Sequence, residues 1–413
     1  MGHTIIEKII GNNVGHEVKP GDIVTVNVDR VMIHDIFIPF VAKKFEEMGF
    51  SRLWDPDKVV LIYDHLVPAS QVDDTRHFRE GNAFVEKYGM KNIHRADGIC
   101  HQLMTEAGYV KPGNIAFGTD SHTTTYGCVG AFSSGIGYTE MAGILGTGEL
   151  WVRVPETIKV TVDGKLPANV TSKDIILRLI GDLTAAGATY KALEFAGSAI
   201  EEMSVASRMT IANMAIEAGA KCALFTPDEK TAEYCEIELT DKERDLVGDA
   251  DAVYVREIHY QAEDLVPVLA CPPQVDNIKP VKDLEGTEID QVFIGSCTNG
   301  RLEDLQAAAE ILKDKKVAPF VKLIVTPASV KIYNQALEDG TIETLVKAGA
   351  IVTHPGCGLC CGRTGGILTD HERVVATNNR NFLGRMGTSK VEIFLASPKT
   401  AAACAAAGKI VEA

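Results

Sequence analysis

DQVFIGSCTNG, residues 290–300, decides the fold class of this 413-residue chain. A short apolar run ends at a glycine and passes into small polar residues, as a buried strand does when it leaves a sheet. Helical and strand-like stretches then alternate to the end of the chain: EDLQAAAEILKDKK (303–316), VKLIVTP (321–327), SVKIYNQALEDG (329–340), GAIVTHPGCG (349–358) and VEIFLASP (391–398). This alternation predicts a doubly wound α/β domain, in which ligands lie beyond the carboxyl ends of the strands.

Two more α/β domains are expected before this one. KVVLIYDHL (58–66) and NIAFGTDSHT (114–123) are strand patterns that end in acid and imidazole groups. The pattern restarts with VPETIKVTVDGKL (154–166), followed by a helix in TSKDIILRLIGDLTAAG (171–187) that has Thr or Ser at its start. A second helical stretch, SRMTIANMAIEAGA (207–220), places Asn213 and Glu217 four residues apart and hence on one face.

The polar, proline-marked stretch CPPQVDNIKPVKDLEGTE (271–288) is interpreted as a connection that ends near residue 284. We therefore expect three domains, over residues 1–155, 156–283 and 284–413. A chain of this length is long enough for several domains that each bury a core.

Composition narrows the function classes. The net charge is −15 and no basic run with interleaved aromatics occurs, which argues against nucleic acid as a partner. No apolar segment approaches the length of a membrane span, and the first thirty residues lack the features of a signal peptide. We expect a cytoplasmic protein without a membrane partner, whose ten cysteines are thiols or ligands and not a disulfide framework.

The glycine-rich stretch THPGCGLCCGRTGG (353–366) crowds Cys357, Cys360 and Cys361 into five residues. One interpretation is that cysteines are packed thiols. It suits the cysteines that lie outside this stretch, with the exception of Cys297, because free cysteine is among the most buried residue types. A structural zinc site would need further ligands, for which His354 or Cys361 is available. An iron–sulfur cluster would use a remote thiolate and glycines that let backbone N–H groups approach the sulfides. The spacing alone leaves all three interpretations open.

The residues around these cysteines favour the third interpretation. Through essentially its whole length the sequence resembles the aconitase family, and most closely the large subunits of its two-chain members. The motifs that carry the resemblance occur in the family's order: YDHL (63–66), GICHQ (98–102), GTDSHT (118–123), RMTIANMAIEAGAK (208–221), GSCTNGR (295–301), PGCGLCCG (355–362) and NNRNFLGRMG (378–387). The resemblance implies three α/β domains of aconitase type around a central iron–sulfur cluster, without the swivel domain of single-chain members.

The resemblance also implies the cofactor. Cys297, Cys357 and Cys360 match the three thiolates that hold a [4Fe–4S] cluster whose fourth iron lacks a protein ligand. An iron with open positions acts as a Lewis acid toward a hydroxyl that is to be lost.

The acid–base groups are carried over in the same way. The matching pairs are Asp64 with His65, Asp120 with His101, and Glu217 with His122, and His65 is the expected general acid. In each pair the carboxylate would orient the ring and stabilise the imidazolium.

Substrate contacts follow from three of the motifs. Arg380 and Arg385 match arginines near the substrate, where a guanidinium fork suits a carboxylate. The other matching polar residues are Asn379, Ser121, Asn213 and His34, the last at a position where some members have glutamine. Arg301, Arg363, His354 and Cys361 receive no role, and Cys361 departs from the apolar residue common at its position.

The expected protein is the large subunit of an iron–sulfur hydro-lyase acting on a small hydroxy di- or tricarboxylate. A small swivel-domain subunit is the expected partner and would supply the carbon base. The favoured reaction is isomerisation of 2- and 3-isopropylmalate in leucine synthesis, and homoaconitase or methylated-malate dehydratase chemistry is the alternative. A non-enzymatic metal- or cluster-binding protein is the rival from another class.

Overall fold

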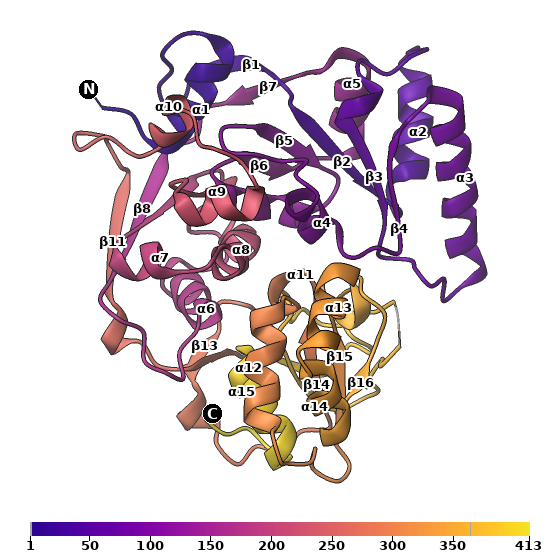
Figure 1. The fold of residues 1–413 in the computed structure, drawn as a ribbon, viewed down its shortest axis with the longest axis vertical. Helices are drawn as coiled ribbons and strands as arrows, with labels where there is room; N and C mark the ends of the chain where they lie inside the picture. Colours follow the sequence, from indigo (N-terminus) through magenta and orange to yellow (C-terminus); the bar gives the residue numbers. More distant parts are fainter. Residues whose placement is uncertain (1, 364) are drawn as a thin grey trace. The chain divides into compact units, whose positions relative to one another are not determined.

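The structure is a computed structural model that describes residues 2–363 and 365–413. The chain forms two compact units, each made from separate segments (Figure 1). The first unit comprises Met1–Arg95, Leu103–Gly164 and Ala188–Tyr260, and the second comprises Ala96–Gln102, Lys165–Gly187 and Gln261–Ala413. Within the described ranges no helix is long and apolar enough to cross a membrane.

The first unit is built on a five-stranded sheet of order β4-β3-β2-β5-β6 in which all neighbours are parallel. Its strands are β2 (Arg30–His34), β3 (Val59–Tyr63), β4 (Asn92–Arg95), β5 (Ile115–Gly118) and β6 (Phe132–Gly135). The chain winds from β2 to one edge and then returns to the other side of β2, so the order reverses between β2 and β5. Such a reversal opens a crevice at the carboxyl ends of the strands.

Apolar runs explain the strands of this sheet. Every residue of β3, Val-Val-Leu-Ile-Tyr, is buried, as expected for a parallel strand covered on both faces. Helix α2 (Ile38–Glu47) packs against α3 (Val72–Tyr88) and α5 (Tyr138–Thr147). The core of the unit continues through α1 (Ile5–Val14), whose Ile5, Ile6, Ile9 and Ile10 are buried in it.

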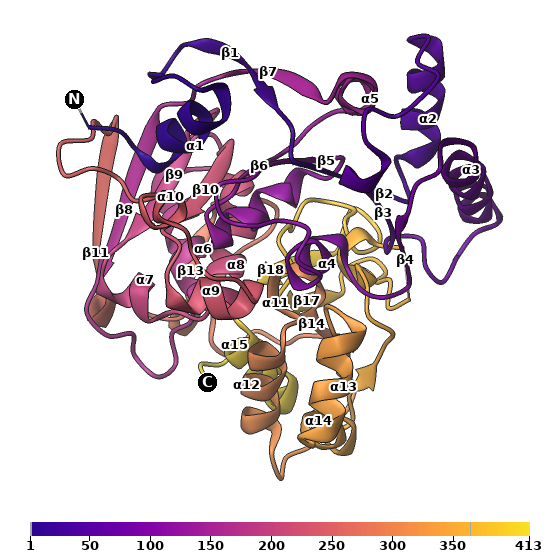
Figure 2. The same ribbon diagram turned by 45° about the horizontal axis from the view of Figure 1, so that its top comes forward.

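The rest of the first unit contains two further sheets. A four-stranded sheet has the order β10-β9-β8-β11, with β8 (Thr157–Asp163) parallel to β9 (Ala192–Ala196) and β9 parallel to β10 (Cys222–Phe225), as Figure 2 shows. The remaining strands are β11 (Arg256–Gln261) and the antiparallel pair β1 (Ile23–Asn27) and β7 (Glu149–Arg153). The helices are α7 (Ser198–Glu202), α8 (Val205–Met214), α9 (Glu229–Cys235) and α10 (Asp241–Arg244).

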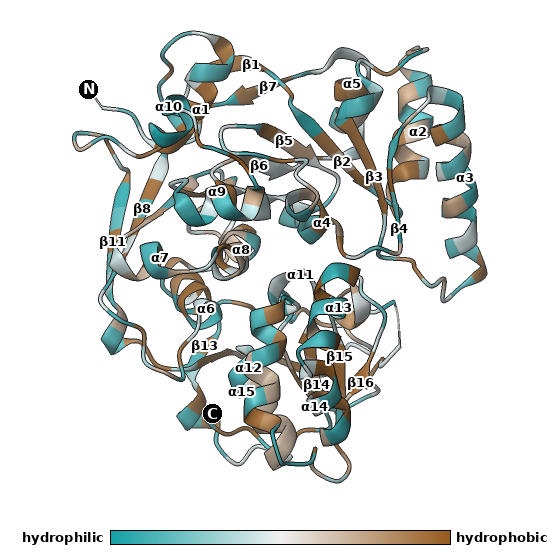
Figure 3. Cartoon of the chain, in the orientation of Figure 1, coloured by the Kyte–Doolittle hydropathy of each residue, from teal (hydrophilic) through white to brown (hydrophobic). Residues whose placement is uncertain are grey.

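The second unit contains a seven-stranded sheet of order β13-β12-β18-β17-β14-β15-β16. Its strands are β12 (Val268–Ala270), β13 (Ile278–Pro280), β14 (Gln291–Gly295), β15 (Lys322–Thr326), β16 (Ile351–Val352), β17 (Arg373–Ala376) and β18 (Glu392–Leu395). The five strands from β18 to β16 are parallel, and β14 and β15 are strongly apolar (Figure 3). The parallel part of the sheet starts at β14, extends to β15 and β16 on one side, and then continues with β17 and β18 on the other side. The strand order therefore reverses between β14 and β17, as it does between β2 and β5 in the first unit. The predicted doubly wound α/β topology is therefore confirmed.

Helix α6 (Ser172–Leu183) of the second unit begins at the residue type that the sequence predicts. It starts at Thr171, which forms a capping box with Asp174. The other helices are α11 (Ser296–Asn299), α12 (Leu302–Leu312), α13 (Val330–Glu338), α14 (Thr341–Ala348) and α15 (Pro398–Ala407). Helix α6 packs on β12 and β13, which brings residues 172–183 to the edge of a sheet formed much later in the chain.

Two sequence interpretations need correction. The stretch 271–288 is not only a connection, because it contributes β13 to the sheet; an edge strand tolerates its Pro280. The helix expected over 207–220 is an α-helix only to Met214 and continues as a 3₁₀ segment, Ala215–Ala218. Asn213 and Glu217 therefore do not follow the spacing of one α-helical face.

The segment Ala96–Gln102 joins the second unit through its backbone. Ile99 N–H donates to Ala328 O at 2.8 Å, and Val330 N–H donates to Asp97 O at 2.8 Å. His101, expected in the first domain, therefore lies on a segment of the second unit; it is part of α4 (Cys100–Glu106). The three domain boundaries stay a prediction.

Candidate functional site

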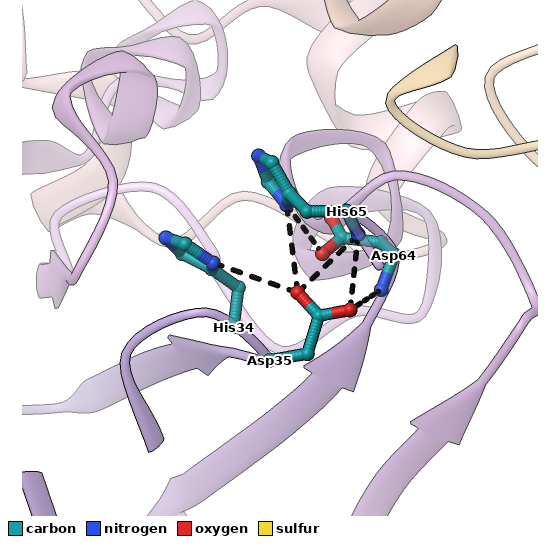
Figure 4. A group of neighbouring side chains, drawn as sticks. All are labelled: His34, Asp35, Asp64 and His65. Carbon is teal, nitrogen blue, oxygen red and sulfur yellow. Dashed lines mark hydrogen bonds and ion pairs between the residues drawn. The ribbon is translucent and has the colours of Figure 1, made fainter. Parts of the chain in front are cut away.

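Four side chains gather at the carboxyl ends of β2 and β3 in the first unit (Figure 4). His34 is the last residue of β2 and Asp35 follows it, and Asp64 and His65 follow β3. The Nδ1 atom of His65 lies 2.7 Å from Asp64 Oδ1, so the predicted pair is in hydrogen-bonding contact. The His34 and His65 rings stack with centroids 4.4 Å apart and an interplanar angle of 28°. All four residues are buried.

Two more predicted residues follow β5. Asp120 accepts a hydrogen bond from the His122 N–H at 2.8 Å, and its Oδ1 lies 3.1 Å from Nδ1 of the same ring. On the opposite side of the ring, Nε2 of His122 lies 2.8 Å from Glu217 Oε1. Asp120 Oδ2 is 3.9 Å from His65 Nε2. The predicted pair of Glu217 with His122 is thus in contact, and Asp120 links the two imidazole groups within the first unit.

The other predicted polar residues of this unit are less central. Ser121 Oγ lies 3.5 Å from His122 Nδ1. Asn213 is fully buried and donates to Thr125 Oγ1 at 2.9 Å, which ties α8 to the 3₁₀ segment Ser121–Val129. The pair of Asp120 with His101 stays a prediction, because these residues belong to different units.

The predicted thiols of the second unit lie beyond the carboxyl ends of β14 and β16. Cys297 lies on α11, immediately after β14, and Cys357 and Cys360 lie on the loop after β16. Asn379, which follows β17, joins the two loops: its Nδ2 donates to Cys297 Sγ and its Oδ1 accepts from Cys360 Sγ, both at 3.5 Å. Asn379 therefore bridges thiols from two segments that lie far apart in the sequence.

The turn before Cys297 is tight. Gly295 has φ 137°, and a side chain there would collide with the backbone of Thr326. Ser296 follows with φ 68°, a left-handed conformation that is uncommon for serine. Strain of this kind persists only where the surrounding structure enforces it, and here it directs the chain into α11 with Cys297 buried.

The thiols have the chemistry of a ligand set. Among the described residues none of the ten cysteines forms a disulfide, although Cys357, Cys360 and Cys361 neighbour one another. The adjacent Cys360 and Cys361 thiols, together with burial, raise the pKa of Cys357 well above its ordinary value. In the metal-free chain these protons must leave before a metal binds, as is usual for thiolate ligands. The buried, converging thiols of Cys297, Cys357 and Cys360 fit an iron–sulfur cluster.

Arginine accompanies the thiols. Arg385 Nη2 donates to Cys360 Sγ at 3.8 Å, and its buried Nε has no hydrogen-bond partner among the described residues. An unpartnered buried N–H is costly unless a ligand accepts from it, and a carboxylate is the matching acceptor. Arg380, five residues earlier, is half-buried beside the Phe382 ring, with its Cζ 5.9 Å from the ring centroid.

Three buried charged residues were missed or left without a role by sequence reasoning. Lys173 on α6 is fully buried, and its Nζ donates to Thr377 O at 2.6 Å and to Asn378 O at 2.7 Å. Arg301 donates to the carbonyls of Cys297 and Thr298, each at 2.6 Å. Asp35 is the third. The sequence did contain a signal for Asp35, because this residue follows His34 at the end of an apolar strand. Nothing near Lys173 in the sequence indicates its distant partners.

The remaining uncommitted residues make local contacts. His354 Nε2 lies 2.7 Å from Ala96 O, and the half-exposed Cys361 donates weakly to Gly358 O at 3.7 Å. These contacts assign neither residue a chemical role.

Comparisons with known proteins agree with this arrangement. A family model described as aconitase family (aconitate hydratase) matches residues 7–287 and 274–408. The chain is 48% identical over 413 residues to the 3-isopropylmalate dehydratase large subunit 1 of Methanopyrus kandleri, covering 100% of this chain and 99% of that protein. It is 45% identical over 410 residues to the probable methanogen homoaconitase large subunit of Methanothermobacter thermautotrophicus, covering 98% and 96%.

A solved structure shares the fold. The crystal structure of Thermococcus kodakaraensis aconitase X in its holo-form is similar with a TM-score of 0.51 and 14% identity, over 86% of this chain and 84% of that one. At this identity the similarity concerns the fold alone.

Proposed function

Since the chain belongs to the aconitase family, we propose that it is the large catalytic subunit of a hydro-lyase that isomerises 2- and 3-isopropylmalate by dehydration and rehydration, a reaction of leucine synthesis. The observation that carries the proposal is the 48% identity, over the whole chain, to a protein named for this activity. A homoaconitase is the second candidate, because a relative with that name is nearly as similar. A methylated-malate dehydratase is the third.

The proposed cofactor is a [4Fe–4S] cluster held by Cys297, Cys357 and Cys360, with one iron left without a protein ligand. When bound, the cluster supplies a Lewis-acidic iron that polarises the hydroxyl group to be lost. Support comes from the burial of the three thiols and from the Asn379 amide that joins two of them. Hydrogen bonds to sulfur also stabilise such ligands and tune the cluster.

The imidazoles handle protons. His65 is proposed to donate a proton to the departing oxygen through Nε2, because its Nδ1 is already engaged by Asp64 at 2.7 Å. That carboxylate fixes the ring's orientation and favours the imidazolium, so the ring can deliver a proton near neutral pH. Glu217 is proposed to orient the His122 ring in the same way, since its Oε1 lies 2.8 Å from His122 Nε2.

Substrate carboxylates are proposed to bind Arg385 and Arg380, whose guanidinium groups suit two-pronged contacts. The unpartnered Nε of Arg385 supports this role. The carbon base is expected from a small subunit, since the relatives are named as large subunits.

The test combines metal analysis with activity. The chain is purified without oxygen, and iron, zinc and acid-labile sulfide are measured for the wild type and for Cys357→Ser. We expect iron and sulfide in near-equal amounts, both lost in the variant. Cys404→Ser is the matched control, because Cys404 is buried in α15 and is not one of the proposed ligands. Zinc without sulfide, repeated after cluster reconstitution, would rule out the proposed cofactor.

Activity then separates the candidate substrates. The chain is combined with a small subunit of the same family, and formation of the unsaturated di- or tricarboxylate product is followed by its ultraviolet absorbance. We expect 3-isopropylmalate to be dehydrated with a higher kcat/KM than homocitrate or methylated malates. A preference for homocitrate would establish the second candidate instead.

A further inference from the structure

Asp35 follows β2, and its side-chain carboxylate accepts hydrogen bonds from the backbone that follows β3. The residue is 0% exposed, and its Oδ2 accepts the N–H groups of Asp64 at 3.1 Å, His65 at 3.1 Å and Leu66 at 2.8 Å. Three consecutive backbone donors therefore converge on one oxygen, and Figure 4 shows the contacts from Asp64 and His65. Removing such an acceptor would leave buried N–H groups unpaired, which is costly.

The other oxygen of Asp35 faces both imidazoles. Its Oδ1 lies 3.7 Å from His34 Nδ1 and 3.9 Å from His65 Nδ1. These separations are too long for hydrogen bonds, but in a buried environment a negative charge 3.9 Å away still favours the protonated form of the His65 ring. The backbone of Asp35 is itself fixed, because its carbonyl lies 3.1 Å from Nδ1 of His77 on α3.

We propose that Asp35 is a positioning residue for the proton donor His65: it fixes the turn that carries Asp64 and His65, and its charge holds the His65 ring in the protonated state. This inference rests on the proposed function of His65. Asp64 orients the ring from its own side chain, whereas Asp35 fixes the backbone from which both side chains project. The two carboxylates therefore have separate tasks.

A metal site is the competing interpretation of the same residues. One ligand atom from each of His34, Asp35, Asp64 and His65 falls within 4.8 Å of the others. However, the Asp35 oxygens already accept backbone N–H groups, and Asp64 is hydrogen-bonded to His65. The contacts satisfy the carboxylates without an ion, which favours the positioning role.

The first test is a pH profile of the reconstituted enzyme with its small subunit. Besides Asp35, the groups that face His65 include Asp64, Asp120 at 3.9 Å and the stacked His34 ring. Asp35→Asn removes one negative charge, so the ring should lose its proton at lower pH. We expect the alkaline limb of kcat to shift down by roughly one pH unit and kcat to fall roughly 30-fold, with KM nearly unchanged.

Asp74→Asn is the matched control. Asp74 is also buried in the first unit and also accepts backbone N–H groups, those of Ser70 and Gln71 at 3.1 Å, but at the start of α3. Its substitution should leave the alkaline limb in place. Asp35→Glu keeps the charge and should restore the limb even if kcat stays low.

A second measurement does not depend on the cluster. In the metal-free chain with ¹⁵N-labelled histidine, the ring shifts of His65 report its protonation directly. Asp35→Asn should move the midpoint of this titration to lower pH, and Asp35→Glu should return it. If Asp35→Asn does not fold, Asp35→Glu against wild type decides: an unchanged midpoint agrees with the charge role, and a midpoint lowered by more than about one unit contradicts it.

Two results would overturn the inference. One is an Asp35→Asn variant in which the alkaline limb of kcat and the midpoint of the His65 ring titration match those of wild type, and in which kcat falls no more than in Asp74→Asn. The other is stoichiometric metal retained by a variant with Cys297, Cys357 and Cys360 replaced by serine, and lost on Asp35→Asn, because Asp35 would then be a metal ligand. A wild-type complex without dehydratase activity would instead refute the proposed function, and the ring titration would still test whether Asp35 sets the protonation of His65.

Discussion

At the scale of single residues, the His122 ring is flanked by two carboxylates, and Glu217 is the one that can be changed without altering a backbone contact in the Asp120 turn. Glu217→Gln keeps the shape and removes the charge. We expect kcat to fall roughly 100-fold, in the range of general acid–base catalysis, as measured on the reconstituted complex.

Glu194→Gln is the control for that substitution. Glu194 is buried in the same unit and accepts hydrogen bonds from Ile5 N–H and Tyr254 Oη. Burial raises its pKa, so replacing the acid with a neutral amide should be tolerated. A loss of kcat as large as that of Glu217→Gln would mean that burial of a glutamate, and not its contact with His122, controls activity.

Asn379 gives a second prediction at this scale. Its amide donates to Cys297 Sγ and accepts from Cys360 Sγ. Asn379→Ala removes both contacts, and Asn379→Asp adds a negative charge beside the thiolates. Because like charges in a buried site repel, we expect iron to be lost faster from the Asp variant than from the Ala variant, and from both faster than from wild type. Iron release to a chelator measures this order, and equal rates for all three proteins would contradict it.

The thiols and the acid–imidazole pairs were predicted from the family motifs in which they stand, and Asp64, His65 and Cys297 also come just after apolar strands. It did not predict Asp35 as part of the site, because the three backbone donors that meet its carboxylate come from another strand end. It also could not place Asn379 between two thiols. Those contacts depend on the strand order, which no local pattern contains.

At the scale of elements, helix α6 contributes Lys173 to the backbone that follows β17, over a separation of more than 200 residues. Burial lowers the pKa of Lys173 to about 7, although Asp304 and the cluster thiols oppose the change. An unfolded lysine titrates near pH 10.4. Between these pH values the unfolded chain binds more protons than the folded one, so the contribution of Lys173 to the free energy of unfolding rises with pH.

Lys173→Met tests this dependence in the metal-free chain. We expect the free energy of unfolding of wild type minus that of the variant to increase by roughly 1–3 kcal/mol between about pH 7 and about pH 9.5. Urea unfolding at several pH values measures the difference. A difference that stays constant or decreases would show that the buried group does not titrate in this window.

Element prediction from the sequence succeeded where apolar runs were long and failed where local signals were weak. Strands β3, β5, β14 and β15 follow from continuous apolar runs, and α6 from its Thr171 cap and helical periodicity. The three-residue strand β13 was missed because the prolines of the stretch 271–288 are typical of a loop. Its strand conformation comes from pairing with β12, a contact absent from any local window.

At the scale of the whole molecule, neither compact unit is one continuous stretch of chain. The second unit needs residues 165–187 and 96–102 in addition to 261–413. A fragment of residues 261–413 lacks α6, which covers β12 and β13 and supplies Lys173. We expect this fragment to unfold without a cooperative transition and to bind a hydrophobic dye.

The control is a fusion of residues 165–187 to 261–413 through a flexible linker. It should regain part of the cooperativity, because the buried face of the sheet edge is covered again. Thermal unfolding followed by circular dichroism compares the fragment, the fusion and the full chain. A cooperative transition in the unfused fragment would show that α6 is dispensable for this unit.

The winding of the seven-stranded sheet has a consequence for biosynthesis. Its central strand β14 leaves the ribosome before β15 and β16, and the neighbour on its other side, β17, follows only after β16, as does the bridging Asn379. Domains tend to fold in the order in which they are synthesised. The sheet of the first unit can therefore form during translation before the second sheet is complete, whereas the thiols of Cys297 and Cys360 can be bridged only after Asn379 has been translated. Lys173 likewise lacks its carbonyl partners, Thr377 and Asn378, until that stage of synthesis.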